Sequence, residues 1–183
     1  SLHDALPICV QDQIFGMSVL ALGLKRYVEM YQWDESKRNH DNHTTYTYSK
    51  KWSDRHISSS GFEQRAGHEN PSSMPYESKR FYANDATLGA YSLQKSVLKE
   101  ATLEEELALM PEHTQRLPAS MQARFKVDGN YYYAGTAANP QIGDVRVSFR
   151  YLPEGVYSVI AAQQNGGLDV YQAAHGPLVL MEP

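Results

Sequence analysis

The chain has 183 residues and a formal net charge of −4, with 42% hydrophobic and 21% charged residues. These proportions are ordinary for one globular domain large enough to bury a core, and the lack of a basic block argues against a nucleic-acid partner. The single cysteine, Cys9, excludes an internal disulfide and a cysteine-based zinc site, and no apolar run reaches the roughly 18 residues that a membrane span needs.

The first eight residues, SLHDALPI, do not resemble the start of a natural protein. They contain neither a methionine nor the charge pattern of a signal peptide, and the string resembles translated adapter sequence of the kind found in metagenomic assemblies. We therefore expect residues 1–8 to be an artefact, with natural sequence beginning near Cys9 or Val10. The chain ends on an apolar run and Pro183, so we expect residues 9–183 to form a single β-rich domain truncated at both ends.

The first strong pattern after this start is a strand beginning at Leu24. The run LKRYVEMYQWDE is rich in aromatic and β-branched residues, which favour a half-buried strand. One face carries Val28, Met30 and Gln32. The other face carries Tyr27, Glu29, Tyr31 and Trp33. Before this strand, from Val10 to Leu22, no clean period is present, and the expected core residues are Phe15, Met17, Val19 and Leu22.

A polar segment from Ser36 to His43 is predicted to be a loop. It is followed by a second strand in which Thr and Tyr alternate from Thr45 to Tyr48. The two strands should form a hairpin, with Trp33 and Trp52 as cross-strand neighbours near its ends.

Two histidines in this polar segment, His40 and His43, are three residues apart with Asp41 between them. On a rigid element such a spacing can hold zinc, but a polar loop lacks the support that a metal site needs. We therefore favour a solvated loop over a metal site, and we expect no cofactor.

The middle of the chain is predicted to combine a loop, a strand and two short helices. Residues 58–75 are rich in Gly, Pro and Ser and should form a loop, and residues 78–88 have a strand-like composition. Ser92 can cap the first helix, and Thr102 with Glu105 forms a capping box for the second. The apolar residues assigned to these helices are Leu93, Val97, Leu98, Leu103, Leu107 and Met110.

From Met121 onward the chain is predicted to be strand and turn. Hairpin turns are expected at residues 128–130 and 165–167. Between them, alternation predicts a strand from Asp144 to Tyr151. Its apolar face carries Val145, Val147, Phe149 and Tyr151, and its polar face carries Asp144, Arg146, Ser148 and Arg150. The predicted fold class is α+β: mainly antiparallel β-sheet built from hairpins, with two short helices.

The polar loop around His68, Glu69 and Asn70 is the place where overlooked chemistry could lie, because functional groups concentrate in loops. The alternative, which we favour, is that His68 and Asn70 bond nearby backbone and hold the shape of the loop. An enzyme would be a hydrolase or metal-dependent activity centred on His68 and Glu69. The sequence contains no nucleophile elbow, phosphate loop, dinucleotide fingerprint or zinc-protease motif to support one.

Two other groups of residues have alternative interpretations. Asp144 and Arg146 share a strand face and can pair with charges of a neighbouring strand. Tyr131, Tyr132 and Tyr133 could line a sheet that binds a lipid or small molecule, although Tyr also suits ordinary half-exposed strand positions. We assign no catalytic, cofactor or metal residue. The candidate interaction or structural residues are Glu29, Trp33, Trp52, His68, Asn70, Asp144 and Arg146.

Three segments in this order and spacing resemble a known family. They are LKRYVEMYQW at residues 24–33, GHENP at residues 67–71 and NPQIGDVRVSF at residues 139–149. Together with TTYTYSKKWSD and YESKRFYANDATLGAYSL between them, they resemble the LUMA family, which comprises transmembrane protein 43 and its bacterial relatives. The similarity extends from about residue 12 to the end of the chain.

This resemblance implies a membrane protein with an N-terminal span, a large hydrophilic domain and several C-terminal spans. The chain would be most of the hydrophilic domain, anchored through spans outside it and facing the lumenal or periplasmic side. Family members are regarded as organisers of membrane protein complexes that associate with themselves and with other membrane proteins. The family has no established catalytic residues, so the resemblance implies a scaffold and no enzyme.

Overall fold

The computed structural model describes residues 2–6, 8–103, 105–159, 162–164, 166–169, 171–173, 176–178 and 181–182, with side chains for residues 9–103, 105–155 and 166–167. The described chain is mostly antiparallel β-sheet with few short helices, as the sequence predicts. None of the helices in the described part has the length and apolar character of a membrane span.

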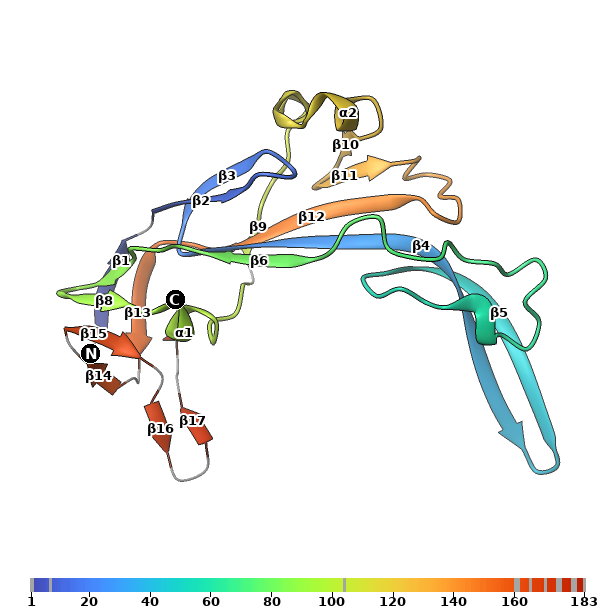
Figure 1. The fold of residues 1–183 in the computed structure, drawn as a ribbon, viewed down its shortest axis with the longest axis horizontal. Helices are drawn as coiled ribbons and strands as arrows, with labels where there is room; N and C mark the ends of the chain where they lie inside the picture. Colours follow the sequence, from blue (N-terminus) through green and yellow to red (C-terminus); the bar gives the residue numbers. More distant parts are fainter. Residues whose placement is uncertain are drawn as a thin grey trace.

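The fold is organised around β4 (Gly23–His40), an 18-residue strand. Over residues 23–30 it pairs with β12 (Val145–Leu152) on one edge, and over residues 23–26 it pairs with β6 (Lys79–Tyr82) on the other. From Met30 onward β5 (His43–Ser53) replaces β6, and the β4–β5 hairpin projects from the rest of the molecule (Figure 1). The central pair β4–β12 joins strands far apart in the sequence, so the sheet is not built from hairpins alone.

Further strands complete this sheet beside β12. β10 (Lys126–Asp128) pairs with β11 (Tyr131–Ala134), as the predicted turn at residues 128–130 requires, and β11 pairs with β12. β9 (Glu105–Glu106) pairs with the far end of β12. A separate two-stranded sheet of β2 (Ile8–Asp12) and β3 (Met17–Ala21) was not predicted.

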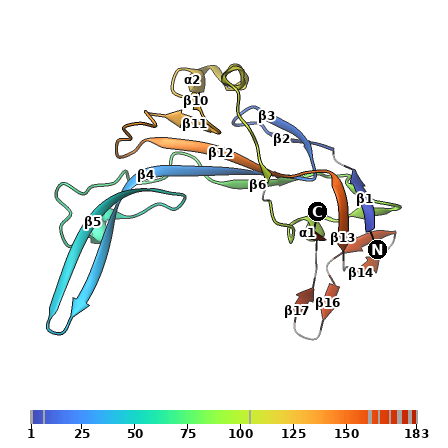
Figure 2. The same cartoon turned by 180° about the vertical axis from the view of Figure 1, so that it is seen from behind.

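A second large sheet lies at the end of the molecule opposite the β4–β5 hairpin (Figure 2). Its strands, in spatial order, are β14 (Ala162–Gln164), β15 (Gly167–Asp169), β8 (Tyr91–Leu93), β7 (Thr87–Leu88), β1 (Leu2–Leu6), β13 (Gly155–Val159) and β18 (Met181–Glu182). The predicted hairpin around residues 165–167 corresponds to β14 and β15. β16 (Tyr171–Ala173) and β17 (Gly176–Leu178) form a small hairpin of their own.

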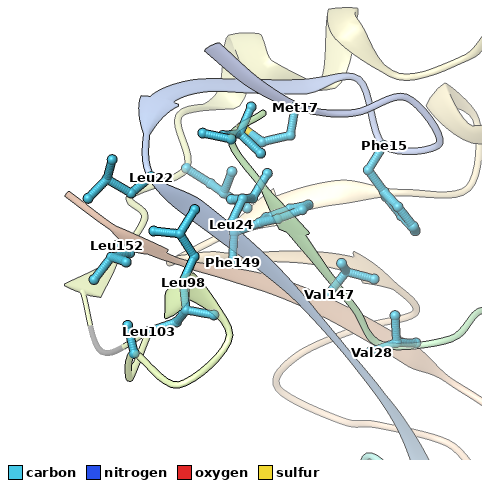
Figure 3. Packing of buried hydrophobic residues seen from close by; sticks show 14 of the residues in the cluster. Phe15, Met17, Leu22, Leu24, Val28, Leu98, Leu103, Val147, Phe149 and Leu152 are labelled. Atoms are coloured by element: carbon cyan, nitrogen blue, oxygen red, sulfur yellow. The ribbon is translucent and has the colours of Figure 1, made fainter. Parts of the chain in front are cut away.

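The apolar core covers one face of the central sheet, which we call the inner face (Figure 3). The alternation predicted from the sequence is confirmed on both central strands: Val28 and Met30 of β4, and Val147 and Phe149 of β12, are buried. Phe15, at the turn between β2 and β3, inserts here and makes edge contacts with Phe125 and Phe149. The expected core residues Phe15, Met17 and Leu22 are buried, and Val19 packs against them.

The helices are short and only partly where the sequence placed them. They are η1 (Ser59–Gly61), α1 (Lys95–Leu98), η2 (Pro111–Arg116) and α2 (Ala119–Gln122). α1 is the first predicted helix, but its N-cap is Gln94, because Ser92 belongs to β8 and pairs with Thr87. The predicted strand from Met121 begins only at Lys126, since Met121 and Gln122 end α2.

The second predicted helix is wrong. Glu105, the acidic member of the expected capping box, pairs with Tyr151 of β12, and Glu106 pairs with Arg150. A strand partner therefore overrides a local helix preference that is worth little without tertiary packing.

The predicted loop at residues 36–43 is also wrong. β4 continues to His40, β5 begins at His43, and Asp41 and Asn42 form the whole turn, with Asp41 at a positive φ of 43°. The polar composition arises because residues 36–45 are exposed, while the backbone remains paired across the hairpin.

Candidate functional site

The outer face of the central sheet, opposite the core, carries the candidate charges. Arg146 of β12 lies directly across from Glu29 of β4. Its Nε donates to Glu29 Oε1 at 2.9 Å, and one Nη donates to Glu29 Oε2 at 3.1 Å. This two-point geometry matches the fork of a guanidinium to the two oxygens of a carboxylate. Both side chains are about one-fifth exposed, so the pair is partly shielded from water.

Aromatic rings enclose the Arg146 guanidinium. The guanidinium carbon lies 4.6 Å from the ring centroid of Trp52 and 4.6 Å from that of Tyr131. Trp52 packs in turn against Tyr31 and Tyr133, with centroids 5.2 Å and 5.9 Å away. Burial alone would lower the pKa of Arg146, but hydrogen bonds to Glu29 and Tyr133 raise it above its ordinary value. The cation is thus permanent and held in place.

The predicted contact between the two tryptophans needs correction. Trp52 faces Tyr31 across the hairpin, and Trp33 faces Lys50, whose ammonium lies 4.9 Å from the Trp33 ring centroid. The two indoles share a face but are offset by two residue pairs along the ladder.

The idea that Tyr131, Tyr132 and Tyr133 line one surface is wrong. Tyr132 points to the inner face, is fully buried, and donates from its hydroxyl to the carbonyl of His113 at 3.1 Å. Burial raises the pKa of Tyr132 to about 12. Successive strand residues face opposite sides, so only Tyr131 and Tyr133 join the outer-face cluster.

Asp144 does not pair with a charge of a neighbouring strand among the described residues. Its carboxylate accepts the backbone N–H of Gln141 at 2.8 Å and closes the turn that leads into β12. Gly135, at a φ of +125°, packs against this carboxylate so closely that a Cβ there would overlap it. Asp144 therefore shapes the entry to the strand that carries Arg146.

Asn70 extends the β4 ladder past the point where β12 begins. Its Oδ1 accepts the N–H of Trp33 at 2.7 Å, and its Nδ2 donates to the C=O of Trp33 at 2.9 Å. The side-chain amide thus takes the place of one residue of a neighbouring strand. Nδ2 also donates to the C=O of Ile57 at 3.0 Å, which fixes the loop of residues 54–78, named here the clamp loop, to the strand.

His68, two residues before Asn70 in the clamp loop, packs against two aromatic rings. Its ring stacks on Tyr48 with centroids 3.8 Å apart and meets Trp33 edge-on at 4.7 Å. Nδ1 lies 2.7 Å from the carbonyl oxygen of Gln64, so Nδ1 carries the proton and donates it. Glu69 accepts the N–H of Gly67 at 3.0 Å. These contacts hold the loop together, and they leave the imidazole wedged between two rings.

A third contact joins the clamp loop to the hairpin. The Tyr48 hydroxyl donates to Glu35 Oε2 at 2.6 Å and accepts the N–H of Gln64 at 2.8 Å. The same Glu35 oxygen accepts the N–H of Glu63 at 2.7 Å. Burial and the hydrogen bond to Glu35 raise the pKa of Tyr48 above its ordinary value.

Two important polar groups on the inner face were missed. Arg26 Nη1 donates to both oxygens of Asp12, at 2.8 Å and 2.9 Å, with the side chains 3% and 1% exposed. Gln32, fully buried, donates to Arg55 O at 3.0 Å and accepts the N–H of Ile57 at 2.7 Å. A warning was present in the sequence, because both residues lie on the apolar face of a predicted strand.

His40 and His43 lie opposite each other beside the two-residue turn, on regular strands. Among the described side chains, no three potential metal ligands gather at one point. The clusters on the outer face and the clamp loop consist of an ion pair, packed rings and amide hydrogen bonds, an arrangement suited to rigidity.

Comparison with known proteins gives one consistent result. The sequence profile of the family described as transmembrane protein 43 matches residues 30–182. The chain is 30% identical over 198 residues to the transmembrane protein 43 homolog of Drosophila melanogaster, covering 99% of the chain and 51% of the fly protein. It is 28% identical over 190 residues to transmembrane protein 43 of Rattus norvegicus and 27% identical to that of Homo sapiens, in each case covering 94% of the chain and 46% of the relative. The chain therefore spans about half the length of these relatives, and no solved structure matches it.

Proposed function

Because the chain belongs to the transmembrane protein 43 family, we propose that it is the extramembrane domain of a membrane protein and acts as a protein-interaction or membrane-organising scaffold. In this proposal the membrane attachment comes from spans outside these residues, and the domain faces the lumenal or periplasmic side. The partners are other membrane proteins or further copies of the same protein.

The observation that carries the proposal is the projecting β4–β5 hairpin. Residues 36–45 are exposed although they lie in regular strands and their turn, and they bury no apolar core. Such a segment gains little from burial, yet the clamp loop braces its base through Asn70 and Tyr48. A rigid, exposed arm suits recognition of a partner.

The edges of the hairpin supply a mechanism for this recognition. β4 is the strand that pairs with β5 in the central sheet, so the second edge of β5 faces away from the sheet. Exposed strand edges recruit extended segments of other chains through main-chain hydrogen bonds. From Thr44 to Ser49 the sequence TTYTYS contains no charged residue to oppose such pairing, whereas Lys50 and Lys51 limit it near the base.

The enzyme alternative has less support. The contacts of His68 are those of a residue that holds its loop in shape, because its ring stacks on Tyr48 and its Nδ1 donates to the carbonyl oxygen of Gln64. The relatives are named as transmembrane proteins and carry no enzyme name.

The proposal is tested in two steps on the complete reading frame. The tagged protein should stay in the membrane pellet after an alkaline wash, with this domain open to protease from one side only. A photo-crosslinking amino acid in place of Tyr46, on the hairpin, should then give a discrete adduct that mass spectrometry identifies as a membrane protein or a second copy. The matched control is Ser18, an exposed position on β3, which should give none.

Two results would contradict the proposal. Release of the complete protein by the alkaline wash would remove the membrane assignment. Equal adducts at Tyr46 and Ser18 would remove the hairpin as the recognition element.

A further inference from the structure

A cavity of about 860 Å³ lies away from the outer-face cluster and the clamp loop. Its walls come from β2, β6, the residues that follow β6, and α1. β6 runs between β2 and α1 in both ribbon views (Figures 1 and 2). The volume falls within the range of about 300–1,000 Å³ that small-molecule sites occupy.

Three cations line this cavity: Arg80, Lys95 and Lys99. The ion pairs among the described residues are Arg26–Asp12, Lys51–Asp34 and Arg146–Glu29, so none of the three cations has a carboxylate partner there. Asp85 is the one acidic residue of the lining. The chain as a whole carries a net charge of −4, which makes this concentration of positive charge a local feature. A concave site in which one sign of charge predominates focuses its potential on an opposite charge.

The rest of the lining is apolar or lacks a partner of its own. Val10 and Ala83 are buried beneath the cavity, and Phe81 is partly buried. The hydroxyl of Tyr82, another lining residue, is buried and has no hydrogen-bond partner among the described residues. Buried polar groups normally have a partner, so this hydroxyl stands out beside the cavity.

We propose that this cavity binds an anionic lipid, with the phosphate head group held by the cations of the lining. Arg and Lys side chains bind phosphate oxygens through charge-assisted hydrogen bonds, and the apolar floor accommodates the first carbons of the chain. The inference deepens the proposed function, on which it rests for the choice of a lipid: the scaffold would contact the bilayer through this cavity. Free phosphate shares the same head-group chemistry, and the experiment separates the two sources.

Cys9 provides a reporter, because it is exposed, lines the cavity and is the single cysteine of the chain. The 183-residue chain is treated with N-ethylmaleimide, an uncharged reagent, and the rate of Cys9 alkylation is measured with three probes. These are dihexanoyl phosphatidic acid below its micelle concentration, dihexanoyl phosphatidylcholine and inorganic phosphate. We expect phosphatidic acid to slow alkylation roughly threefold or more, because a ligand seated in the cavity lies against its walls and so covers the Cys9 thiol that lines it. The other two probes should have little effect.

Two double variants locate the binding. K95E/K99E should raise the concentration of phosphatidic acid needed for protection by about tenfold or more, because it replaces attraction by repulsion in the cavity. K37E/R38E makes the same change of net charge on the exposed hairpin and should leave protection intact. Circular dichroism of both variants checks that each is folded.

The outcomes separate clearly. No protection by any probe, or equal weakening by the two double variants, overturns the site. Protection by inorganic phosphate equal to that by phosphatidic acid overturns the lipid assignment and identifies a free-anion site. Alkylation of Cys9 is measured on the 183-residue chain in solution, whereas the alkaline wash and crosslinking are done on the complete protein. The lipid site and the scaffold function can therefore fail independently of each other.

Discussion

From Gly23 to Met30, strand β4 pairs with β12, and over its first four residues also with β6, with its inner face in the apolar core. From Tyr31 to His40 it pairs with β5 outside that core. In the first half, buried residues such as Val28 and Met30 contribute about 1.5–3 kcal/mol each. In the second half the inner face carries Gln32 and then polar residues. Hydrogen bonds to the clamp loop, rather than burial of apolar side chains, therefore stabilise this half.

This comparison shows that one continuous strand can be ordered by two different means. The first half is stabilised by burial and by an ion pair, Arg26–Asp12, that is itself buried. The second half is stabilised by amide contacts of about 0.5–1.5 kcal/mol each, chiefly through Gln32 and Asn70. Damage to the first half should therefore unfold the domain, and damage to the second should loosen the hairpin.

The largest effect is expected from Asp12→Ala. It leaves Arg26 charged and buried without its carboxylate, and breaking such a pair costs about 3–5 kcal/mol. It also removes the acceptor for the N–H groups of Ile14 and Phe15, which hold the turn that places Phe15 in the core. Urea unfolding followed by circular dichroism should show one cooperative transition at a lower midpoint.

The matched control is Asp34→Ala, which removes the partner of Lys51 from a pair that is 49% and 27% exposed. Surface pairs contribute about 0–1 kcal/mol, so its midpoint should barely move. Equal losses in the two variants would show that burial does not distinguish the halves of the strand.

The second prediction concerns alkaline pH and Tyr132 in the core. Its pKa is raised from 10.0 to about 12 by burial, so the unfolded chain releases this proton first as the pH rises. The stabilising contribution is complete below about pH 10 and is lost as the pH rises towards 12. The free energy of unfolding of the wild type should therefore fall more steeply over this window than that of Tyr132→Phe. Parallel pH profiles would place the Tyr132 hydroxyl in contact with water.

The sequence predicted the parts of the fold that depend on local alternation. Val147 and Phe149 face the core and Arg146 faces outward because a strand buried on one face must alternate. The hairpin of residues 24–52 was predicted as a pair of strands, but its tip was not, because polar residues at 36–43 are compatible with either a loop or an exposed ladder. Pairing between the two strands decides whether this segment is a loop or a ladder, and the composition of the segment does not reveal that pairing.

The missed features depend on contacts between distant positions. Asn70 meets Trp33 across 37 positions, and Arg26 meets Asp12 across 14. Sequence periodicity relates residues only a few positions apart, so it cannot identify partners at these separations. The capping box at Thr102 was misleading for the same reason, since β12 supplied Glu105 with a strand partner from much later in the chain. The visible sign was the presence of Arg26 and Gln32 on an apolar strand face, because a buried polar or charged group requires a partner.

The third prediction tests the second half of β4 through Asn70→Ala. Loss of the amide leaves the N–H and C=O of Trp33 without their present partners and should cost about 1–2 kcal/mol. Amide hydrogen exchange should accelerate at Trp33 and in the clamp loop while Val28 and Val147 remain protected. Asn70→Asp sharpens the test, because it keeps the acceptor for Trp33 N–H but loses both Nδ2 donations. Faster exchange at Val28 would show that the clamp loop also supports the core.

The smallest effect is expected from Arg146→Lys, at the boundary between the two halves. Lysine keeps the charge opposite Glu29, but it cannot make the two-point contact or lie flat between Trp52 and Tyr131. Because a cation–π contact at a partly exposed site is worth about 0.5–1 kcal/mol, we expect a loss of that size in urea unfolding. Raising the ionic strength should weaken the Glu29 attraction in both proteins and leave the difference between them nearly unchanged. If the difference instead disappears at high salt, charge rather than planar packing fixes Arg146, and the outer face is held together by screened electrostatics alone.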